Sequence, residues 1–209
     1  MADVRIVDYE MGNLRSVQKA LETVGADARI TQDADEVRRA DRLVLPGVGA
    51  FGDAADALRR RHLDSAVRDF IATGRPFLGI CLGLQLLFDV GFEDGEYPGL
   101  GVLAGRCVPL PGDLCGPDGR RLKVPHMGWN SLQIVHRSPI LDGLDDGCQV
   151  YFVHSYVVEP EDPAIVSTRT DYGAAFTSSV CRGNVMATQF HPEKSQTVGL
   201  RMLENFVRF

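Results

Sequence analysis

The sequence predicts an α/β fold with a central, mostly parallel sheet flanked by helices and a strand-rich antiparallel extension in the second half. Two patterns indicate this. The first half alternates short apolar runs with stretches of helical period, whereas the second half consists mainly of short runs that suit hairpin strands. Strands separated by helices usually join through right-handed crossovers, so the first half is expected to form the parallel part of the sheet.

The elements of the first half have recognisable starts and stops. Strands are expected at Val4–Asp8, Ala28–Thr31, Arg42–Leu45 and Pro76–Ile80, and helices at residues 14–24, 33–40 and 52–73, the last broken near 61–63. Asn13 has the residue type of a helix N-cap, and Gly25 that of a helix stop. Ligands of such sheets bind at the carboxyl ends of the strands, where Gly47-Val48-Gly49 and Cys81 are expected to lie.

The second half is rich in expected strands. They span Val102–Leu110, Lys123–Val124, Ser131–Val135, Gln149–Val158, Ala164–Arg169, Ala174–Cys181 and Val185–Phe190. The segment Pro109–Arg121 is rich in Pro and Gly and is expected to be a loop, and Gln196–Phe209 has the apolar spacing of a closing helix. Without an internal repeat or a low-complexity linker, residues 1–209 are expected to form one domain.

Composition and charge argue against several classes of function. The formal net charge is −6 and Lys and Arg form no cluster, so a nucleic-acid binder is not expected. Neither a signal peptide nor an apolar stretch of membrane-spanning length is recognised, and a cytoplasmic protein without a membrane partner is expected. The 5 cysteines are scattered without a Cys-x-x-Cys pair, and the histidines lack ligand spacing, so no metal site is predicted.

Cys81 lies in the most informative segment of the chain. The apolar run 77–80 reads as a buried strand, Gly79 and Gly83 flank the cysteine, and an apolar run with helical spacing follows. This is the strand–turn–helix pattern of a nucleophile elbow, with sulfur in place of a hydroxyl. The positive end of a helix dipole favours a thiolate there. The alternative is a buried structural cysteine, the commonest fate of a free thiol.

His191 and Glu193 supply partners for such a nucleophile. They follow an expected strand and are separated by Pro192, which keeps the preceding residue extended. Residues two apart in an extended segment project to the same side, so the carboxylate can fix the imidazole tautomer and stabilise its protonated form. Cysteine, histidine and an orienting carboxylate form the generalised triad of acyl transfer. Taken alone, the tripeptide also suits a solvated turn.

These residues carry a resemblance to a known family. Gly-x-Cys-x-Gly-x-Gln at 79–85 and His-Pro-Glu at 191–193 resemble the motifs of class I, triad-type glutamine amidotransferases. Segments 8–17, 45–52, 125–130, 151–156 and 189–196 resemble the branch that serves as glutaminase subunits of imidazole glycerol phosphate synthases in histidine biosynthesis. The resemblance runs nearly end to end and implies a flavodoxin-like amidotransferase fold. One departure is Glu10, which stands where glycine is expected.

The resemblance and the residues together imply a mechanism without a cofactor. Cys81 attacks the carboxamide of glutamine to form a thioester, His191 transfers protons, and Glu193 holds the imidazole. Backbone N–H groups of Leu82 and Val48 are expected to form the oxyanion hole. Binding of glutamine is assigned to Gly47, Gln85, His154, Ser155 and Tyr156. For His154 the alternative is a hydrogen-bonded core histidine, and for Gln85 it is a helix-surface side chain.

The resemblance also implies a partner protein. Subunits of this kind dock on a (βα)₈-barrel synthase subunit as a heterodimer and pass ammonia through the barrel. Positions that match interface motifs are Asn13, Arg15, Met127, Trp129 and Lys194, although a lone Trp is more often a core residue. Three alternatives remain: a subunit for another synthase, such as anthranilate, aminodeoxychorismate or pyridoxal phosphate synthase, a non-catalytic binding module of the same fold, or a stand-alone cysteine hydrolase.

Overall fold

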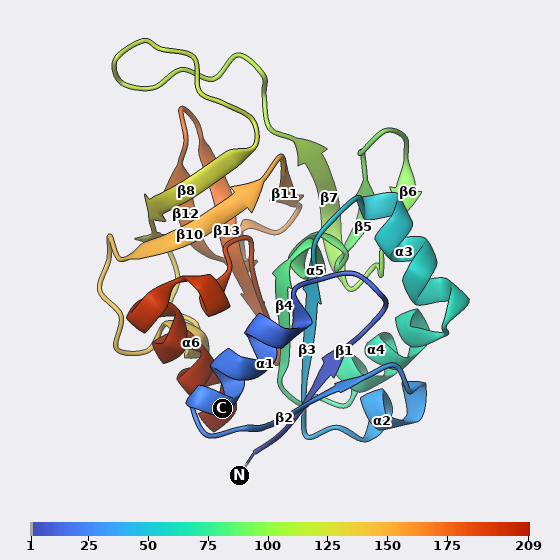
Figure 1. Cartoon of the computed structure of the whole chain (residues 1–209). Coiled ribbons are helices and arrows are strands. Elements are labelled where there is room, and N and C mark those ends of the chain that lie inside the picture. Colours follow the sequence, from blue (N-terminus) through green and yellow to red (C-terminus); the bar gives the residue numbers. More distant parts are fainter. Residues whose placement is uncertain (1) are drawn as a thin grey trace.

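A parallel sheet forms the centre of the structure, a computed structural model that describes residues 2–209 (Figure 1). Its strands lie in the order β2-β1-β3-β4-β14, and neighbouring strands are parallel. Their bounds are β1 Asp3–Val7, β2 Asp27–Thr31, β3 Arg42–Gly47, β4 Phe77–Cys81 and β14 Val185–Thr188. The predicted α/β class is confirmed, and the late strand β14 lies next to the strand that leads into Cys81.

Helices cover both faces of this sheet. Residues of β3 show the division, because Leu43 and Leu45 share a core with α2, α3 and α4, whereas Val44 shares one with α1 and α6. The helices are α1 Leu14–Thr23, α2 Ala34–Arg39, α3 Phe51–Arg60, α4 Leu63–Ala72, α5 Leu82–Gln85 and α6 Gln196–Arg208. The helical segments expected in the first half are therefore present, and the predicted break near 61–63 separates α3 from α4.

Local signals explain where α1 and α2 begin and end. The side chain of Asp33 accepts hydrogen bonds from the backbone N–H groups of Asp35 and Glu36 and so caps α2. Asn13 occupies the N-cap position of α1, as predicted, but its side chain makes no capping hydrogen bond. Gly25 follows α1 with a φ of 88°, a conformation that favours glycine.

The second half extends the sheet with mostly antiparallel strands, as predicted. β13 pairs with β14, and β11, β7, β5 and β6 continue outward from it. The strands are β5 Phe88–Gly91, β6 Tyr97–Pro98, β7 Leu103–Pro109, β9 Gln133–Ile134, β11 Tyr156–Pro160, β12 Val166–Asp171 and β13 Ala175–Arg182. The described residues also form the 3₁₀ helices η1 Pro139–Leu141 and η2 Pro163–Ile165 between strands, and η3 Pro192–Lys194 between β14 and α6.

The prediction of a single strand at Gln149–Val158 is wrong, because Ser155 interrupts it and two strands form instead. β10 (Gln149–His154) pairs with β8 (His126–Ser131) in a separate two-stranded ribbon, whereas β11 turns into the main sheet. The predicted alternation holds only in β10, where Val150, Phe152 and His154 are buried. In β11 the neighbours Val157 and Val158 are both buried, because they pack into different hydrophobic cores, one on each face of the sheet.

Three shorter predictions also differ from the structure. Lys123–Val124 is not a strand, since the chain there belongs to the long loop that projects between β7 and β8 (Figure 1). The helix after Cys81 is a single turn, because the chain then continues as β5, which pairs with β6 and β7. Ser131–Val135 is divided between the end of β8 and the short strand β9. No helix within residues 2–209 combines the length and the hydrophobicity needed to cross a membrane.

Candidate active site

Cys81 ends β4 in a strained turn of the kind predicted. Its φ of 55° and ψ of −109° put a non-glycine residue in a sparsely populated conformation. The flanking glycines permit it. A Cβ at Gly79 would lie 2.8 Å from the carbonyl oxygen of Gly83, and a Cβ at Gly83 would lie 1.8 Å from that of Leu45. β4 and the one-turn helix α5 are therefore pressed against their neighbours, and the thiol is held at the carboxyl edge of the sheet.

His191 and Glu193 reach the same edge because β14 runs parallel to β4. Ala187 lies opposite Gly79 in this pair of strands, so the chain after β14 emerges beside Cys81. His191 Nδ1 and Glu193 Oε1 are 2.8 Å apart, and both side chains are buried. Ser195 anchors the turn, since its Oγ donates to the backbone oxygen of His191 at 2.7 Å and accepts from the backbone N–H of Tyr151 at 3.0 Å.

The surroundings of His191 favour a protonated imidazole. Burial alone would lower the pKa of His191, but hydrogen bonding to Cys81 and Glu193, with the charges of both groups, outweighs burial and raises it to about 9. Nδ1 is held by Glu193, and Nε2 is buried without a hydrogen-bond partner of ordinary geometry among residues 2–209. The imidazole is thus left with one nitrogen for the chemistry at Cys81.

A cavity of about 220 Å³ opens in front of Cys81. It is lined by Val48, Gly49, Cys81, Leu82, Gln85, Glu93, Val153, His154, Ser155 and Tyr156. Val48 and Leu82 are brought together because Gly47, at the end of β3, lies opposite Cys81, at the end of β4. The cavity is smaller than pockets that take drug-sized molecules and suits a small polar ligand.

Gly47 itself is absent from the lining of this cavity, and its lack of a side chain has another cause. A Cβ there would lie 2.2 Å from the hydroxyl of Tyr9 and 2.9 Å from Cβ of Leu82. Tyr9 is buried, and its hydroxyl donates to the backbone oxygen of Pro46 at 2.9 Å. Burial raises the pKa of this phenol, and Cys81 adds to the effect. Glycine is required at position 47 by this packing rather than by the approach of a ligand.

His154 and Gln85 differ in how many of their side-chain polar atoms remain available to bind a ligand. His154 Nδ1 contacts the backbone oxygen of Tyr156 at 2.9 Å and Nε2 contacts Nδ1 of His126 at 3.0 Å. Both ring nitrogens are thus used inside the protein, which matches the core alternative for this histidine. Gln85 Nε2 donates to the same Tyr156 oxygen at 3.3 Å, and the side chain is buried at the edge of the cavity.

The comparisons with known proteins agree with this geometry. The family model of class I glutamine amidotransferases matches residues 5–209. The imidazole glycerol phosphate synthase subunit HisH of Rhodopirellula baltica is 55% identical over 205 residues, which cover 97% of this chain and 96% of that protein. The subunit of the same name from Aquifex aeolicus is 54% identical over 97% of this chain and 95% of its own length.

This chain belongs to the class I glutamine amidotransferases, and within them to the HisH subunits of imidazole glycerol phosphate synthase. Solved structures show the same fold. A crystal structure of a glutamine amidotransferase has a TM-score of 0.75 at 22% identity and covers 99% of this chain and 98% of its own. PurLQS of Thermotoga maritima has a TM-score of 0.74 at 19% identity over 99% of this chain and 98% of that chain.

Glu93 is a cavity residue of this amidotransferase that the sequence did not reveal. It is the carboxylate among the described residues that line the cavity, and its Oε2 accepts a hydrogen bond from the backbone N–H of Phe51 at 2.6 Å. Glu93 comes just after β5, a strand that was itself missed. An acidic residue at an unrecognised strand end carries no local signal, so its place in the site follows only from the fold.

The residues predicted for a partner interface lie on one side of the amidotransferase. On the β8–β10 ribbon, Met127 and Trp129 are 62% and 46% exposed, opposite Val153 and Tyr151 respectively. We call these four residues the outer face of the ribbon. Lys194 Nζ lies 6.0 Å from the centre of the Tyr151 ring, and η3 contacts α1, which begins next to the exposed residues Asn13 and Arg15.

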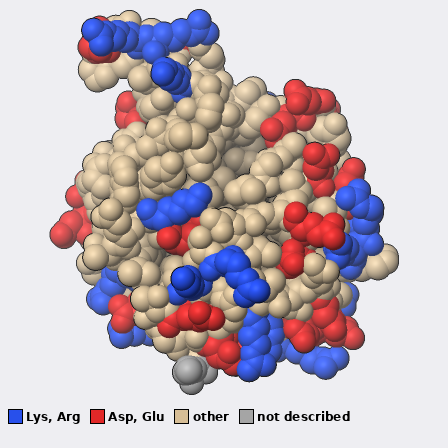
Figure 2. Space-filling view, viewed as in Figure 1, with Lys and Arg blue, Asp and Glu red and all other residues tan. Residues whose placement is uncertain are grey.

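Figure 2 shows that charged side chains are sparse on the surface over β8 and β10. Lys and Arg side chains gather instead on the projecting loop above it, which contains Arg120, Arg121 and Lys123. An uncharged surface with an exposed Trp and Met has the composition of the central part of a protein interface. The structure therefore leaves this side of the amidotransferase suited to a partner.

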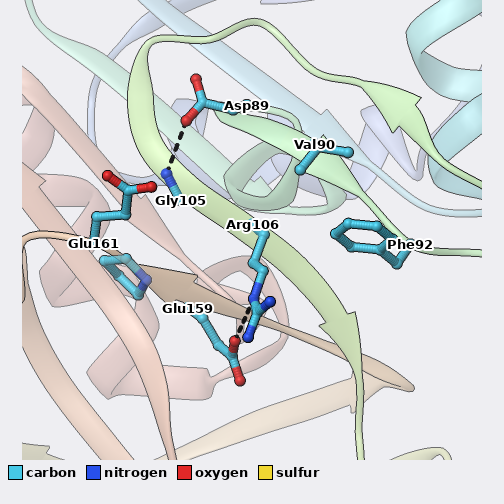
Figure 3. Close-up of a pocket in the computed structure, with 8 residues that line it drawn as sticks. Asp89, Val90, Phe92, Gly105, Arg106, Glu159 and Glu161 are labelled. Atoms are coloured by element: carbon cyan, nitrogen blue, oxygen red, sulfur yellow. Dashed lines mark hydrogen bonds and ion pairs between the residues drawn. The ribbon is translucent and has the colours of Figure 1, made fainter.

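A larger cavity of about 430 Å³ lies away from Cys81, beside β5, β7 and β11 (Figure 3). It is lined by Asp89, Val90, Phe92, Gly105, Arg106, Glu159, Pro160 and Glu161. Its charged groups are partly paired, since Arg106 Nε donates to Glu159 Oε2 at 2.7 Å and the Gly105 N–H donates to Asp89 Oδ2 at 2.9 Å. No predicted site residue lines this cavity, and we place the chemistry at the smaller one.

Proposed function

We propose that this amidotransferase hydrolyses glutamine to glutamate and ammonia and delivers the ammonia to a synthase partner in histidine biosynthesis. One observation carries the proposal: the triad-like group Cys81, His191 and Glu193 converges at the edge of the parallel sheet beside a small cavity. The identity of 55% to a HisH subunit over nearly the whole chain supports the same function.

The chemistry is acyl transfer in two halves. Cys81 Sγ, as thiolate, attacks the carboxamide carbon of glutamine, and the tetrahedral intermediate collapses as His191 gives its proton to the departing ammonia. The C–N bond breaks and a C–S thioester remains. Water, deprotonated by His191, then attacks the thioester, and glutamate leaves while Cys81 regains its starting state. Glu193 holds the imidazole in the tautomer and orientation that both halves need.

The negative oxygen of each tetrahedral intermediate requires donors. The backbone N–H of Leu82 stands at the start of α5, and that of Val48 lies in the glycine-flanked turn across the cavity. Removing one donor of an oxyanion hole typically lowers turnover by about 10²–10³-fold. Gly49, with a φ of 99°, permits the Val48–Gly49 peptide to turn, and we propose that the partner's substrate brings this donor into place.

The ends of glutamine meet complementary groups in the cavity. Glu93 supplies a carboxylate for the α-ammonium, and Gln85 has a carbonyl oxygen left after its amide nitrogen has donated to Tyr156. His154, Ser155 and Tyr156 also line the cavity and can offer backbone groups to the ligand. These assignments leave the His154 ring as a core group whose role is to hold that part of the lining.

The partner follows from the relatives and from the surface. The HisH relatives are named as subunits of imidazole glycerol phosphate synthase. We propose that the outer face of the ribbon, with Asn13, Arg15 and Lys194, docks in the cytoplasm on a (βα)₈-barrel subunit that makes imidazole glycerol phosphate and aminoimidazole carboxamide ribonucleotide. A tight dock keeps ammonia from water, where protonation would remove its lone pair.

The test separates glutamine hydrolysis from use of ammonia. In a complex with the barrel subunit, Cys81→Ala is expected to abolish synthesis from glutamine and to leave synthesis from added ammonium salt unchanged. Cys115→Ala, at an exposed thiol, is the matched control and should retain both activities. Loss of both activities in Cys81→Ala, with the complex intact, would contradict this division of labour. Reconstitution with anthranilate, aminodeoxychorismate or pyridoxal phosphate synthase partners tests the alternatives.

A further inference from the structure

Gln189 is a buried polar residue that the proposed mechanism does not use. It lies between β14 and His191 and is 0% exposed. Its Nε2 is 3.7 Å from Cys81 Sγ, and its Oε1 is 3.2 Å from Nε2 of Gln85. Two residues of one short segment, His191 and Gln189, therefore both reach the reacting sulfur.

The orientation of the Gln189 amide is fixed by a backbone group. The Tyr156 carbonyl oxygen can only accept, so the atom of Gln85 that lies 3.3 Å from it must be the amide nitrogen. That same nitrogen faces Gln189, which must therefore present its oxygen to Gln85. The NH₂ of Gln189 is then the group left to face Cys81 Sγ. Rotating this amide by 180° would put two donors against each other and an oxygen against the sulfur.

The other polar contact of the sulfur has the opposite chemistry. The backbone oxygen of Val153 lies 3.8 Å from Cys81 Sγ and can only accept, so it suits a protonated thiol. An ionised sulfur needs donors, and Gln189 offers one from a buried position where a hydrogen bond to a charged group is strong. The two contacts thus favour different protonation states of the same atom.

We propose that the amide of Gln189 is the hydrogen-bond donor that stabilises the thiolate of Cys81, and that Gln85 locks this amide in its donating orientation. The proposal rests on the proposed function, because it assigns Gln189 a catalytic role in that reaction. It also gives Gln85 a second task, since one side chain borders the cavity and orients the group behind the nucleophile.

A test must separate this amide from the titratable groups around Cys81. These are His191 and, through it, Glu193, with Tyr9 and Cys107 in the core and His154 and Glu93 at the cavity. Replacing Gln189 by an uncharged residue changes none of them. Alkylation of the free amidotransferase by iodoacetamide reports the reactivity of the sulfur without glutamine or a partner. Peptide mapping restricts the signal to Cys81.

The variant is Gln189→Met, which keeps the length of the side chain and removes the donor. We expect alkylation of Cys81 at pH 7 to slow by about 10-fold or more, as for a lost hydrogen bond to a charged group, and the rate–pH curve to move to higher pH. Gln133→Met, on the exposed side of β9, is the matched control and should follow the wild type. Wild-type rates and an unmoved curve for Gln189→Met would overturn the proposal.

A second variant keeps the test decisive where Gln189→Met folds poorly. Gln189→Leu is uncharged, has a similar volume and also lacks the donor, so the rate–pH curve is expected to move to higher pH as for Gln189→Met; an unmoved curve would again overturn the proposal. A purely structural role would lower the unfolding midpoint and leave the curve in place. In the complex, we expect kcat for glutamine to fall more than KM rises. If the proposed function itself is wrong, the wild-type complex will lack glutaminase activity. That result does not depend on the alkylation rates.

Discussion

Glu193 and His191 are buried neighbours, and the imidazole favours its charged form although burial opposes it. The carboxylate has one oxygen on His191 Nδ1, and its other oxygen, Oε2, is buried without a hydrogen-bond partner among residues 2–209. A carboxylate so placed stabilises a neighbouring imidazolium strongly, because little solvent screens the two charges. The pKa of His191 is raised because hydrogen bonds to Cys81 and Glu193, with the charges of both groups, outweigh burial.

We expect Glu193→Gln to keep the imidazole in place and to lose most of its activity. The neutral amide removes the charge that favours the imidazolium and can present the wrong hydrogen-bonding group to Nδ1. Partner-stimulated glutaminase turnover should fall by about 10²–10⁴-fold, the range of general acid–base catalysis. Glu159→Gln, at an exposed position beside the larger cavity, is the control and should be unaffected. Equal turnover in both variants would contradict the role of Glu193.

His126 and His154 make stability depend on pH in the acid range. Both are buried, and burial lowers the pKa of His126 from 6.5 to about 4 and that of His154 to about 3, the latter despite its hydrogen bond to the backbone of Tyr156. The folded state therefore holds both rings neutral, and the unfolded state binds more protons below pH 6.5. This stabilisation is complete above pH 6.5 and is lost as pH falls toward 4.

Urea unfolding at pH 7, 6 and 5 measures this dependence. The free energy of unfolding should fall by up to about 1.4 kcal/mol per pH unit for each histidine. His126→Gln is expected to make the decline shallower, whereas His62→Gln, at an exposed position, should leave it as in the wild type. An identical decline in His126→Gln would show that the acid sensitivity arises elsewhere.

At the scale of single residues, the sequence was enough to identify candidate site residues that belong to a local motif. Cys81 and His191 lie in segments whose turn and spacing are readable without the fold, and the structure brings them together. Glu93 and Gln189 carry no such signal, since each becomes a site residue only because distant strands place it there. The sequence could not decide between a ligand-binding and a core role for the His154 ring. Only the fold shows that its two nitrogens contact His126 and the backbone oxygen of Tyr156.

Among the elements, the turn after β3 carries the Val48 N–H that we propose as an oxyanion donor. Gly49 has a φ of 99°, and a Cβ there would lie 2.6 Å from the end of the Met11 side chain. Gly25 has a comparable φ of 88°, with no described atom within 4 Å of a Cβ. The two glycines have a similar backbone conformation, but only Gly49 lines the cavity.

We expect Gly49→Ala and Gly25→Ala each to lower the free energy of unfolding by about 1–2 kcal/mol, because alanine disfavours positive φ. Only Gly49→Ala should also reduce partner-stimulated glutaminase activity, by about 10-fold or more, since it hinders the turn that supplies the Val48 N–H. Urea titration and a coupled glutamate assay measure the two effects. Full stimulated activity in Gly49→Ala would rule out a rearrangement of this peptide.

The boundaries of an element were predictable where one of its faces is buried and the other is exposed. They were not predictable where the chain passes from one sheet to another. The alternation in 149–154 reflects a ribbon with one buried face, but nothing in the residue types marks Ser155 as the point where the chain crosses to β7. β5 was missed for a related reason. Its residues continue an apolar run of helical spacing, and they form a strand because β6 and β7 pair with them.

For the whole molecule, the outer face of the ribbon adjoins the catalytic cavity. Val153 belongs to that face, lines the cavity and lies opposite Met127. A partner docked on Met127 and Trp129 would thus contact the strand next to Val153, whose backbone oxygen lies 3.8 Å from Cys81 Sγ. The α/β architecture that produces this arrangement was predictable, because alternating strands and helices impose the parallel sheet; the ribbon was not, because its two strands come from segments with weak patterns.

Trp129→Ala is expected to weaken the complex with the barrel subunit by about 2 kcal/mol, or about 30-fold in Kd, as for a buried aromatic hot spot. Phe209→Ala, at another exposed aromatic residue, should bind as the wild type does. Calorimetric titration measures both. Trp129 is the 1 tryptophan of the chain, so a shift of its emission on mixing with the partner reports contact directly. Unchanged affinity and emission would move the interface elsewhere.

The position of β14 between β4 and β13 has a consequence for synthesis of the protein. All five residues of β4 are buried, yet one of its two neighbours is encoded more than a hundred residues later. A nascent chain that stops short of β14 leaves a fully apolar strand with an open edge, the kind of surface that recruits other chains and degradation machinery. Incomplete molecules are therefore prone to aggregate or be cleared before they can compete for the synthase.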